Sequence, residues 1–492
     1  MIFYLSCVLP LIKIAVILLL LLSLSTLLLL FSIQSWVSIA AIKTTTISSP
    51  CITYDSSKNL IKITCSSANL TDIYNQLHNE SILRKQQQSS SSPVAAAAAP
   101  DTREWLLNAN ITIAKGTTLY INSTDTSWLK IISDGTSNTA YAIEVYGSLK
   151  IDSVKVTSWN PTTNNYIRDD NNTGKIPRPF IRVEKDATGT TDITNSEIAY
   201  LGYQRVSGEE HSGLTYYGGN GSVLRGNNIH NLWFGFYSSG VGGIVVENNQ
   251  VHDNSHYAFD PHTGTHDMIF RNNRIYNNVA QGIICSLDCY NITIENNQLY
   301  NNGIGTTESS GIMFSRNMSN SVARNNIIRN ETQGIFVSSS HSNEVYNNTI
   351  SDSTYGIYVR AGAYTVNGIY TTAGAYNNTI HHNIIINPLF SGIVVNRGAS
   401  ENRFYSNIVQ YAKHYAIDIE DSNTTKNTFK DNHIINSSAD SPIRQNTNNT
   451  TNIIISPSTN DPIIVSTNND ANKNPIQGMK IPFQHGDKIN TQ

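Results

Sequence analysis

Charged residues are scarce in this chain of 492 amino acids, where only 14% are Asp, Glu, Lys or Arg. The net charge is -3, so there is no basic excess, and nucleic-acid binding lacks its electrostatic footprint. An acidic polymer would therefore have to be held by individually placed Arg and Lys side chains. Residues that favour helices are also under-used, because Asn, Ser, Thr and Ile dominate. This profile favours a β-rich protein with many tight turns.

Cysteine is rare as well, with five residues in the chain. Cys51 and Cys65 are spaced to close a short loop by a disulfide, and Cys285 and Cys289 suggest a second, tighter pair. The plainer alternative is four unrelated small residues. No His lies at ligand spacing beside them, which argues against a zinc site. The calcium-binding nonapeptide repeat is absent too. The sequence thus requires no cofactor, and it leaves calcium binding open.

The long hydrophobic run is N-terminal. Lys13 precedes an uncharged, Leu-rich stretch at residues 14–42. About 20 apolar residues can span a bilayer, whereas the apolar part of a secretory signal usually has about 7–15. Residues 1–43 are therefore predicted to be a signal peptide or an uncleaved membrane anchor. Either alternative places the remainder outside the cytoplasm, secreted or anchored to the outer face of the cell membrane.

The composition divides the rest of the chain into three parts. Residues 44–100 are predicted to be a polar region that contains a short cap helix, begun by Asn69 or Thr71, and then a low-complexity linker. From residue 101 to residue 440, short alternating runs of strand-forming residues are separated by Gly, Asn, Ser and Asp. Residues 441–492 are again polar and are expected to form an end cap or tail.

The strand-rich part repeats itself about every 22–25 residues. A second marker, Gly or Ala before an apolar or aromatic residue, keeps the same period, and two longer steps indicate loop insertions. The first marker is an Asn pair or its equivalent, which ends at Asn228, Asn249, Asn273, Asn297, Asn326, Asn348, Asn383, Asn407 and Asn432.

The repeat predicts an all-β fold, a right-handed parallel β-helix. One repeat is too short to bury its own apolar face, but stacked coils can bury it together. Asn side chains at one corner of successive coils can form a hydrogen-bonded ladder, so the Asn pairs have a structural role. Leucine-rich repeats are the alternative, and the Leu framework that they require is missing.

One repeat contains an acid–His pair, in the segment from Tyr257 to Asp267. Aligned on the Gly/Ala marker, Asp260 and His262 point outward on one exposed face, about 6.6–7 Å apart along the strand. His262 is a candidate proton-transfer group because its ordinary pKa lies near neutrality. The plain alternative is a solvated sheet face. The same face is expected to present apolar platforms for sugar rings, namely Tyr237, Met313, Phe336 and Tyr358.

The motif Tyr257-Ala-Phe-Asp-Pro-His262 resembles the Asp-Pro-His motif of mannuronan (alginate) C5-epimerases, in particular the periplasmic type with a right-handed β-helix. The flanking coils, such as Trp233-Phe-Gly-Phe-Tyr237 and Gly311-Ile-Met-Phe-Ser-Arg316, are similar to that family. The resemblance implies that a base removes the proton from C5 of a uronic-acid residue and that a proton returns from the opposite face. It also implies that His262 is the base and that Asp260 and Tyr257 are its partners.

Two departures separate this chain from the family. The motif His is followed by Thr263 in place of an acid. The family uses an Arg one coil after the motif to neutralise the substrate carboxylate, and by register that position is Leu287. Arg316, one further coil along and about 10 Å from the motif coil, is the first substitute considered. Other basic residues that could supply the charge are Arg271, Arg274, Arg168 and Arg178.

The sequence thus predicts an extracytoplasmic C5-epimerase that converts mannuronate to guluronate in a linear uronic-acid polysaccharide. Its partners would be that anionic polymer and, if the leader is uncleaved, a membrane; no nucleic acid is expected. A polysaccharide lyase and a non-catalytic glycan-binding β-helix of the cell surface are the alternatives. The expected catalytic residues are His262, Asp260 and Tyr257, and the expected substrate-binding residues are Arg316, Tyr237, Met313, Phe336, Tyr358 and Arg271.

Overall fold

The computed structural model describes residues 50–86, 103–204, 211–303, 309–366, 369–438, 442–445 and 451–455. Backbone contacts separate a unit Met1–Cys51 from a unit Ile52–Gln492, and the architecture below is that of the second unit. Among the described residues, no helix has the length and hydropathy needed to cross a membrane. The predicted leader at residues 1–43 lies outside them.

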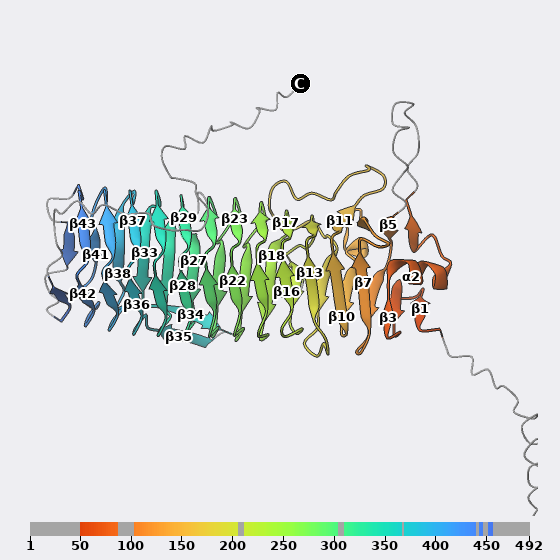
Figure 1. The fold of residues 1–492 in the computed structure, drawn as a ribbon, viewed down its shortest axis with the longest axis horizontal. Coiled ribbons are helices and arrows are strands. Elements are labelled where there is room, and N and C mark those ends of the chain that lie inside the picture. The colour runs from red at the N-terminus through yellow and green to blue at the C-terminus, as the bar shows by residue number, and fades with distance from the viewer. Residues whose placement is uncertain are drawn as a thin grey trace, which may run out of the picture. The chain divides into compact units, whose positions relative to one another are not determined.

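Three long sheets, A, B and C, wind around a common core as a right-handed parallel β-helix, which confirms the predicted fold (Figure 1). From residue 110 to residue 435, each coil contributes one strand to each sheet. Sheet A consists of β1 Ile52–Asp55, β2 Leu60–Ile63, β6 Asn110–Ile113, β9 Ala142–Val145, β12 Phe180–Val183, β15 Gly213–Tyr216, β18 Phe234–Ser239, β21 Phe259–His262, β24 Ile283–Ser286, β27 Ser310–Ser315, β30 Gln333–Ser338, β33 Tyr355–Arg360, β38 Ser391–Asn396, β41 Ile417–Ile419 and β44 Ile443–Gln445.

Sheets B and C follow sheet A in each coil. Sheet B consists of β3 Ser67–Ala68, β7 Thr118–Asn122, β10 Ser148–Asp152, β13 Thr191–Thr194, β16 Val223–Arg225, β19 Val245–Glu247, β22 Ile269–Arg271, β25 Thr293–Glu295, β28 Val322–Arg324, β31 Glu344–Tyr346, β36 Thr379–His381, β39 Arg403–Tyr405, β42 Thr428–Lys430 and β45 Ile453–Ile455. Sheet C consists of β4 Leu83–Lys85, β5 Glu104–Leu107, β8 Trp128–Ile132, β11 Lys155–Trp159, β14 Glu197–Ala199, β17 Asn228–His230, β20 Gln250–His252, β23 Arg274–Tyr276, β26 Gln298–Tyr300, β29 Ile327–Arg329, β32 Thr349–Ser351, β37 Ile384–Ile386, β40 Ile408–Gln410 and β43 His433–Ile435.

The Asn pairs form the corner between sheets B and C. The first Asn of a pair takes the left-handed conformation that the turn requires, as Asn296 does with a φ of 56°. The second Asn points inward: Asn297 Nδ2 donates to the Phe270 carbonyl (2.9 Å) and to Asn326 Oδ1 (3.0 Å). The ladder residues from Asn227 to Asn407 repeat these bonds, so the ladder satisfies buried backbone groups along that part of the stack. In the first of these coils the ladder residue is Asn227, one position before the one that the sequence analysis marked.

The first coil begins earlier than residue 101. Strand β2 pairs with β6, β3 with β7 and β4 with β5, so residues 52–85 supply strands to all three sheets. Helix α2 (Leu70–Leu77) lies between β3 and β4 and begins at Asn69, whose side chain and Asp72 form a capping box. Strands β44 and β45 likewise continue sheets A and B past residue 440. A 3-10 turn, η1, spans Ser137–Thr139.

The cysteines divide into a bonded pair and a free pair. Cys51 and Cys65 are both disulfide-bonded, and the β1/β2 hairpin between them sets Ile52 opposite Ile63. Cys285 and Cys289 are free and buried, so the predicted second disulfide is wrong. Cys285 is an inward strand residue, and burial raises the pKa of its thiol. The Cys289 thiol donates to the Ser286 carbonyl (3.4 Å), which holds it as a buried corner residue.

Candidate active site

The outer face of sheet A carries one continuous column of side chains around the motif. Strand register aligns Tyr237 with Asp260, and it aligns Met313, Phe336 and Tyr358 in the coils beyond. A second column, two residues further along each strand, aligns Ser239, His262, Ser286, Ser315 and Ser338. Pro261 lies between the two columns within β21, where it has no N–H to donate to the neighbouring strand.

This face is largely buried, which corrects the expectation of an open platform. Asp260 is 3% exposed, and Tyr237, Met313 and Phe336 are buried as well. The side chains close over one another because they are large and only one strand spacing, about 4.8 Å, apart. Ile284, Met313 and Phe336 form one apolar cluster, and Trp233, Phe234 and Tyr237 form another.

Tyr257 lies across the motif coil and joins the two clusters. Its ring packs against both of them and stacks on His256, with ring centroids 4.0 Å apart. Tyr257 is only half-buried, so its ring covers the outer column while part of it remains accessible. Of the predicted catalytic residues, Tyr257 and Asp260 are therefore brought to the same stretch of the sheet A face.

His262 is uncharged at neutral pH in this environment. Burial lowers its pKa from the ordinary 6.5 to about 4, and the positive charge of Arg316 acts in the same direction. Its Nδ1 atom is hydrogen-bonded to the hydroxyl of Thr263. With the proton on Nδ1 and donated to that hydroxyl, Nε2 is the atom with a free lone pair. An uncharged imidazole with one oriented nitrogen has the form that a general base requires.

Arg316 is two coils from the motif and still acts on His262. Backbone bonds align Thr263, Leu287, Arg316 and Ser339 at the corner between sheets A and B, each with a left-handed φ. Leu287 therefore occupies the position predicted from the register. The side chain of Arg316 is exposed, and its charge contributes to the lowered pKa of His262. The structure thus brings these two predicted residues together.

An inserted hairpin reaches the same corner. Strands β34 (Gly362–Val366) and β35 (Ile369–Ala373) pair with each other and account for the longest repeat step. The pKa of Tyr364 on β34 is raised by burial and by the carboxylate of Asp288, while Arg316 opposes that shift. Asp288 and Arg316 belong to coils that precede the hairpin, so the hairpin folds back toward the motif coil. The sequence indicated an insertion here but not its direction.

On the other side of His262 the surface is hollowed by about 460 Å³. Arg182, Lys185, Tyr217 and Thr263 contribute to the lining, and Ser239 lies beside His262 in register. Arg182 is paired with Glu144 (2.7 Å) and Glu184 (2.6 Å). Sequence reasoning missed this side of the site. The alternation in Phe180–Val183 places Arg182 in the outward column and could have identified it.

Several predicted basic residues lie elsewhere. Arg271 is on β22 in sheet B, where it pairs with Glu247 (2.6 Å), so it is not at the sheet A face. Arg274 is on sheet C beside Tyr276 and Tyr300. The alternation of a strand predicts which side chains point outward, but outward residues of the three sheets face three directions. Arg168 and Arg178 lie at the corner between sheets C and A, described below.

The site and fold define a parallel β-helix with a buried Asp260 and a half-buried His262 on one sheet. The structure resembles the periplasmic alginate epimerase AlgG, with a TM-score of 0.58, 19% identity, and coverage of 82% of this chain and 85% of that one. The A-module of the mannuronan C-5 epimerase AlgE6 of Azotobacter vinelandii gives 0.47 and 16%, over 73% of this chain and 89% of that module. The likeness to AlgG supports the fold.

A family model, the periplasmic copper-binding protein NosD, matches residues 190–371. No curated protein sequence matches the chain significantly. Within the described residues, no three His, Cys, Asp or Glu side chains gather where they could hold a metal ion. Copper prefers imidazole and sulfur ligands. Cys285 and Cys289 are enclosed, and the free thiol of Cys289 donates to carbonyls, so they do not fit such a centre.

Proposed function

We propose that this protein is an extracytoplasmic C5-epimerase of a linear uronic-acid polysaccharide, of the mannuronate-to-guluronate type. The observation that carries the proposal is His262: a half-buried, uncharged imidazole two residues from Asp260 in the strand, with the charge of Arg316 acting on it. The resemblance of the motif to that of C5-epimerases and the likeness of the fold to AlgG support it. The disulfide-bonded Cys51 and Cys65 suit an oxidising, extracytoplasmic compartment.

In the proposed reaction His262 Nε2 takes the proton from C5. The electron pair of the C–H bond moves into the neighbouring carboxylate, whose added charge Arg316 stabilises. Tyr257 then donates its phenolic proton to C5 from the opposite face. His262 returns its proton to water, and the tyrosinate takes one from water. Asp260 has a positioning role within the strand. No bond of the polymer backbone is broken.

Arg316 could supply the positive charge that the family's Arg provides at the position of Leu287. An Arg side chain extends about 6–7 Å from its backbone, roughly the distance that separates neighbouring coils plus a contact. From two coils away it can therefore meet a carboxylate that lies over the intervening coil. Tyr364, beside Arg316, supplies a further hydroxyl at the same place.

The experiment is incubation of the protein with polymannuronate. Proton NMR should show guluronate signals growing while the chain length stays constant. A lyase would use the same proton abstraction but would release unsaturated, ultraviolet-absorbing ends, so their appearance would replace the epimerase with a lyase. Unchanged NMR spectra with tight binding of the polymer would favour a non-catalytic glycan-binding protein.

A further inference from the structure

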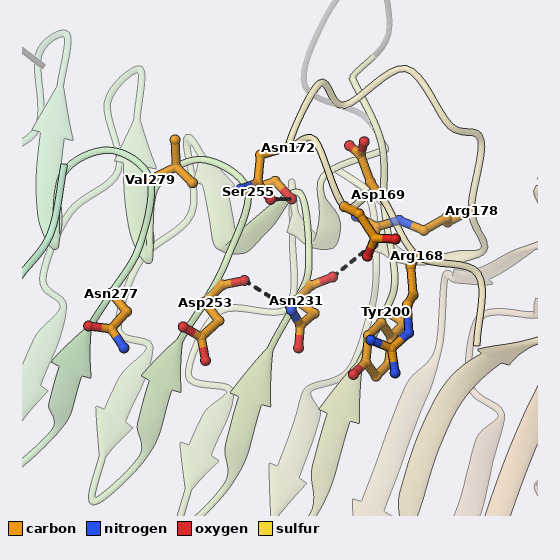
Figure 2. Close-up of a pocket in the computed structure, with 11 residues that line it drawn as sticks. Arg168, Asp169, Asn172, Arg178, Tyr200, Asn231, Asp253, Ser255, Asn277 and Val279 are labelled. Carbon is orange, nitrogen blue, oxygen red and sulfur yellow. Dashed lines mark hydrogen bonds between the residues drawn. The ribbon is translucent and has the colours of Figure 1, made fainter. Parts of the chain in front are cut away.

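A second polar cavity lies on another edge of the β-helix, at the corner between sheets C and A. It has a volume of about 300 Å³, within the range of small-molecule sites. Figure 2 shows Asn231, Asp253 and Asn277 in a row at successive corners, with Tyr200 at one end of the row. Four coils at about 4.8 Å spacing make this row about 14 Å long.

Tyr200, at the end of this row, has a backbone conformation that is uncommon for a bulky residue. Asn231, Asp253 and Asn277 have left-handed φ values of 56°, 53° and 56°, which Asn and Asp adopt readily. Tyr200 takes the same conformation, with a φ of 58°, at a cost of roughly 1–2 kcal/mol for a bulky residue. Strained residues of this kind collect at functional sites.

Tyr200 holds an arginine at the mouth of the cavity. One face of its ring stacks on Tyr166, with centroids 4.3 Å apart, and the guanidinium of Arg168 lies 5.7 Å from its centroid. Arg168 is exposed, so the stack fixes the direction of a charged group that would otherwise be free to move in solvent.

The loop that carries Arg168 also covers the cavity. Asn172 Oδ1 accepts a hydrogen bond from Ser255 Oγ (3.0 Å), and Gly174 fits against Trp233, where any added Cβ would approach the ring to 2.6 Å. Ser255 directly precedes the His256–Tyr257 pair, so the loop is fastened to the motif coil (Figure 2).

Arg178 lies at the inner wall and is 1% exposed. Its Nε donates to the Gly202 carbonyl (2.7 Å) and its Nη1 to the Asn231 carbonyl (2.9 Å). Nη2 is buried and has no hydrogen-bond partner. Burial lowers the pKa of Arg178 to about 10 although Asp169 lies nearby. The two hydrogen bonds to carbonyls of different coils give Arg178 a structural role. They leave its buried Nη2 without an acceptor.

Two of the acidic groups of the cavity are already engaged. The carboxylate of Asp169 accepts bonds from Thr173 N (3.2 Å) and Gly174 N (2.6 Å), and that of Asp253 from His252 Nδ1 (2.7 Å). Asp170 is exposed at the rim. Asn231 Nδ2 already donates one hydrogen to the Asp253 carbonyl (3.4 Å). The donors left over belong to the two arginines, to the Asn277 amide and to the second hydrogen of the Asn231 amide, which suits a ligand that brings acceptors.

We propose that this corner cavity, formed by Arg168, Arg178, Tyr200 and the Asn231–Asn277 row, binds one carboxylate-bearing sugar residue. Arg168 and Arg178 Nη2 bind the carboxylate, and the amides of Asn231 and Asn277 bind the ring hydroxyls. The site stands on its own contacts and does not depend on the reaction proposed for His262, although its ligand class is that of the proposed substrate. It would hold a chain end beside the motif coil.

The test is calorimetric titration of the full-length protein with sodium glucuronate, with methyl mannoside as the neutral sugar and sodium sulfate as the inorganic anion. Wild type should bind glucuronate, and Arg168→Ala should weaken that binding at least fivefold. Arg271→Ala, which removes an arginine paired with Glu247 on sheet B, should leave it unchanged. Arg178→Lys keeps the charge but has no Nη2, and it should weaken glucuronate binding. A cooperative thermal unfolding transition should show that this variant is folded.

Undiminished glucuronate binding in Arg168→Ala would overturn the proposal. So would equal binding of methyl mannoside, or binding of sulfate without glucuronate, because these results would remove the role of the carboxylate or that of the sugar. Loss of epimerase activity in His262→Ala with glucuronate titration intact would keep the two proposals separate. If Arg178→Lys does not fold, the result with Arg168→Ala still decides.

Discussion

The outer faces of sheets A and B are built from the same coils at the same spacing, but their charges are arranged differently. On sheet B, Glu247 lies between Arg225 and Arg271, and Glu295 pairs with Arg324. The charges alternate up the stack and neutralise one another. On sheet A, the column around Asp260 is flanked by Tyr237 and by apolar residues.

The difference separates a face that stabilises the stack of coils from the face on which we propose the chemistry. An ion pair between neighbouring coils orders both side chains and leaves little charge to act on a ligand. An acid and an imidazole that lie among apolar groups interact more strongly with a charged ligand, because few dipoles screen the interaction. A column of side chains that repeats from coil to coil therefore indicates a structural role. A column whose pattern changes at one coil indicates a candidate site. Arg271 and Arg316 illustrate the two outcomes for one residue type.

The largest expected effect contrasts these two arginines. Arg316→Ala removes the charge that neutralises the substrate carboxylate, so kcat/KM should fall about 100-fold. Arg271→Ala, on sheet B, should leave kcat/KM within about twofold of wild type. Steady-state epimerisation rates of the two purified variants measure the contrast. Arg316→Lys should recover part of the loss, and equal rates for both alanine variants would remove the distinction between the faces.

The two faces should also differ in the pH at which they lose stability. Beside the motif, burial lowers the pKa of His256 and of His262 to about 4, below the ordinary 6.5. Between pH 6.5 and 4 the unfolded chain binds protons at these positions and the folded chain does not, so stability falls as the pH falls. On sheet B, the pKa of Glu247 is lowered by its hydrogen bonds to Arg271 and Arg225 although burial opposes the shift, so its contribution is lost below pH 4.5.

His256→Phe tests this pH window, since it keeps an aromatic ring against Trp233 and Tyr257 and removes one titrating group. The slope of unfolding free energy between pH 6.5 and 4 should decrease by about 1.4 kcal/mol per pH unit at most. Denaturant titrations at a series of pH values provide the slope. A slope identical to that of wild type would show that His256 is protonated in the folded protein.

A smaller effect is expected when the sheet B ladder is broken. Glu247→Gln leaves Arg225 and Arg271 without their shared carboxylate, so the free energy of unfolding should fall by about 1 kcal/mol with epimerase activity retained. The matched control is Glu401→Gln, because Glu401 pairs with Lys426 at the surface and both side chains are largely exposed. A greater loss in the control than in Glu247→Gln would contradict the account.

The smallest effect concerns the Nδ1 partner of His262. Thr263→Asp places a carboxylate there, which should raise the pKa of His262 and shift the acid limb of the pH–rate profile upward by about one unit. Thr263→Asn has similar shape without the charge, and it should leave the limb near pH 4. The profile of kcat/KM from pH 3.5 to 8 provides the comparison. Coinciding limbs in the two variants would exclude Thr263 as the partner of the reactive imidazole.

The repeating parts of the molecule were predictable because one physical reason recurs in every coil. The Asn pairs predicted the ladder, and Asn69 was one of the two residues predicted to begin α2. The period and the outward register of Asp260 and His262 followed from strand alternation. These features depend on local backbone geometry, which the sequence encodes within a few residues.

The remaining features depend on long side chains and on contacts between coils. Alternation could not show that Tyr257 closes over Met313 and Phe336, or that Arg271 belongs to another sheet. Close spacing of Cys285 and Cys289 could not reveal that both thiols remain free and buried. The loop and hairpin that border the two sites are insertions, so the repeat contains no information about where they fold.

The central claim is that His262 removes the C5 proton of a uronan. The direct measurement is deuterium incorporation at C5 when wild type and His262→Ala are incubated with polymannuronate in heavy water. Wild type should introduce deuterium at C5 without shortening the chain, and His262→Ala should do so about 10³-fold more slowly. Absence of C5 deuterium with wild type across several uronans, or an undiminished rate in His262→Ala, would contradict the account.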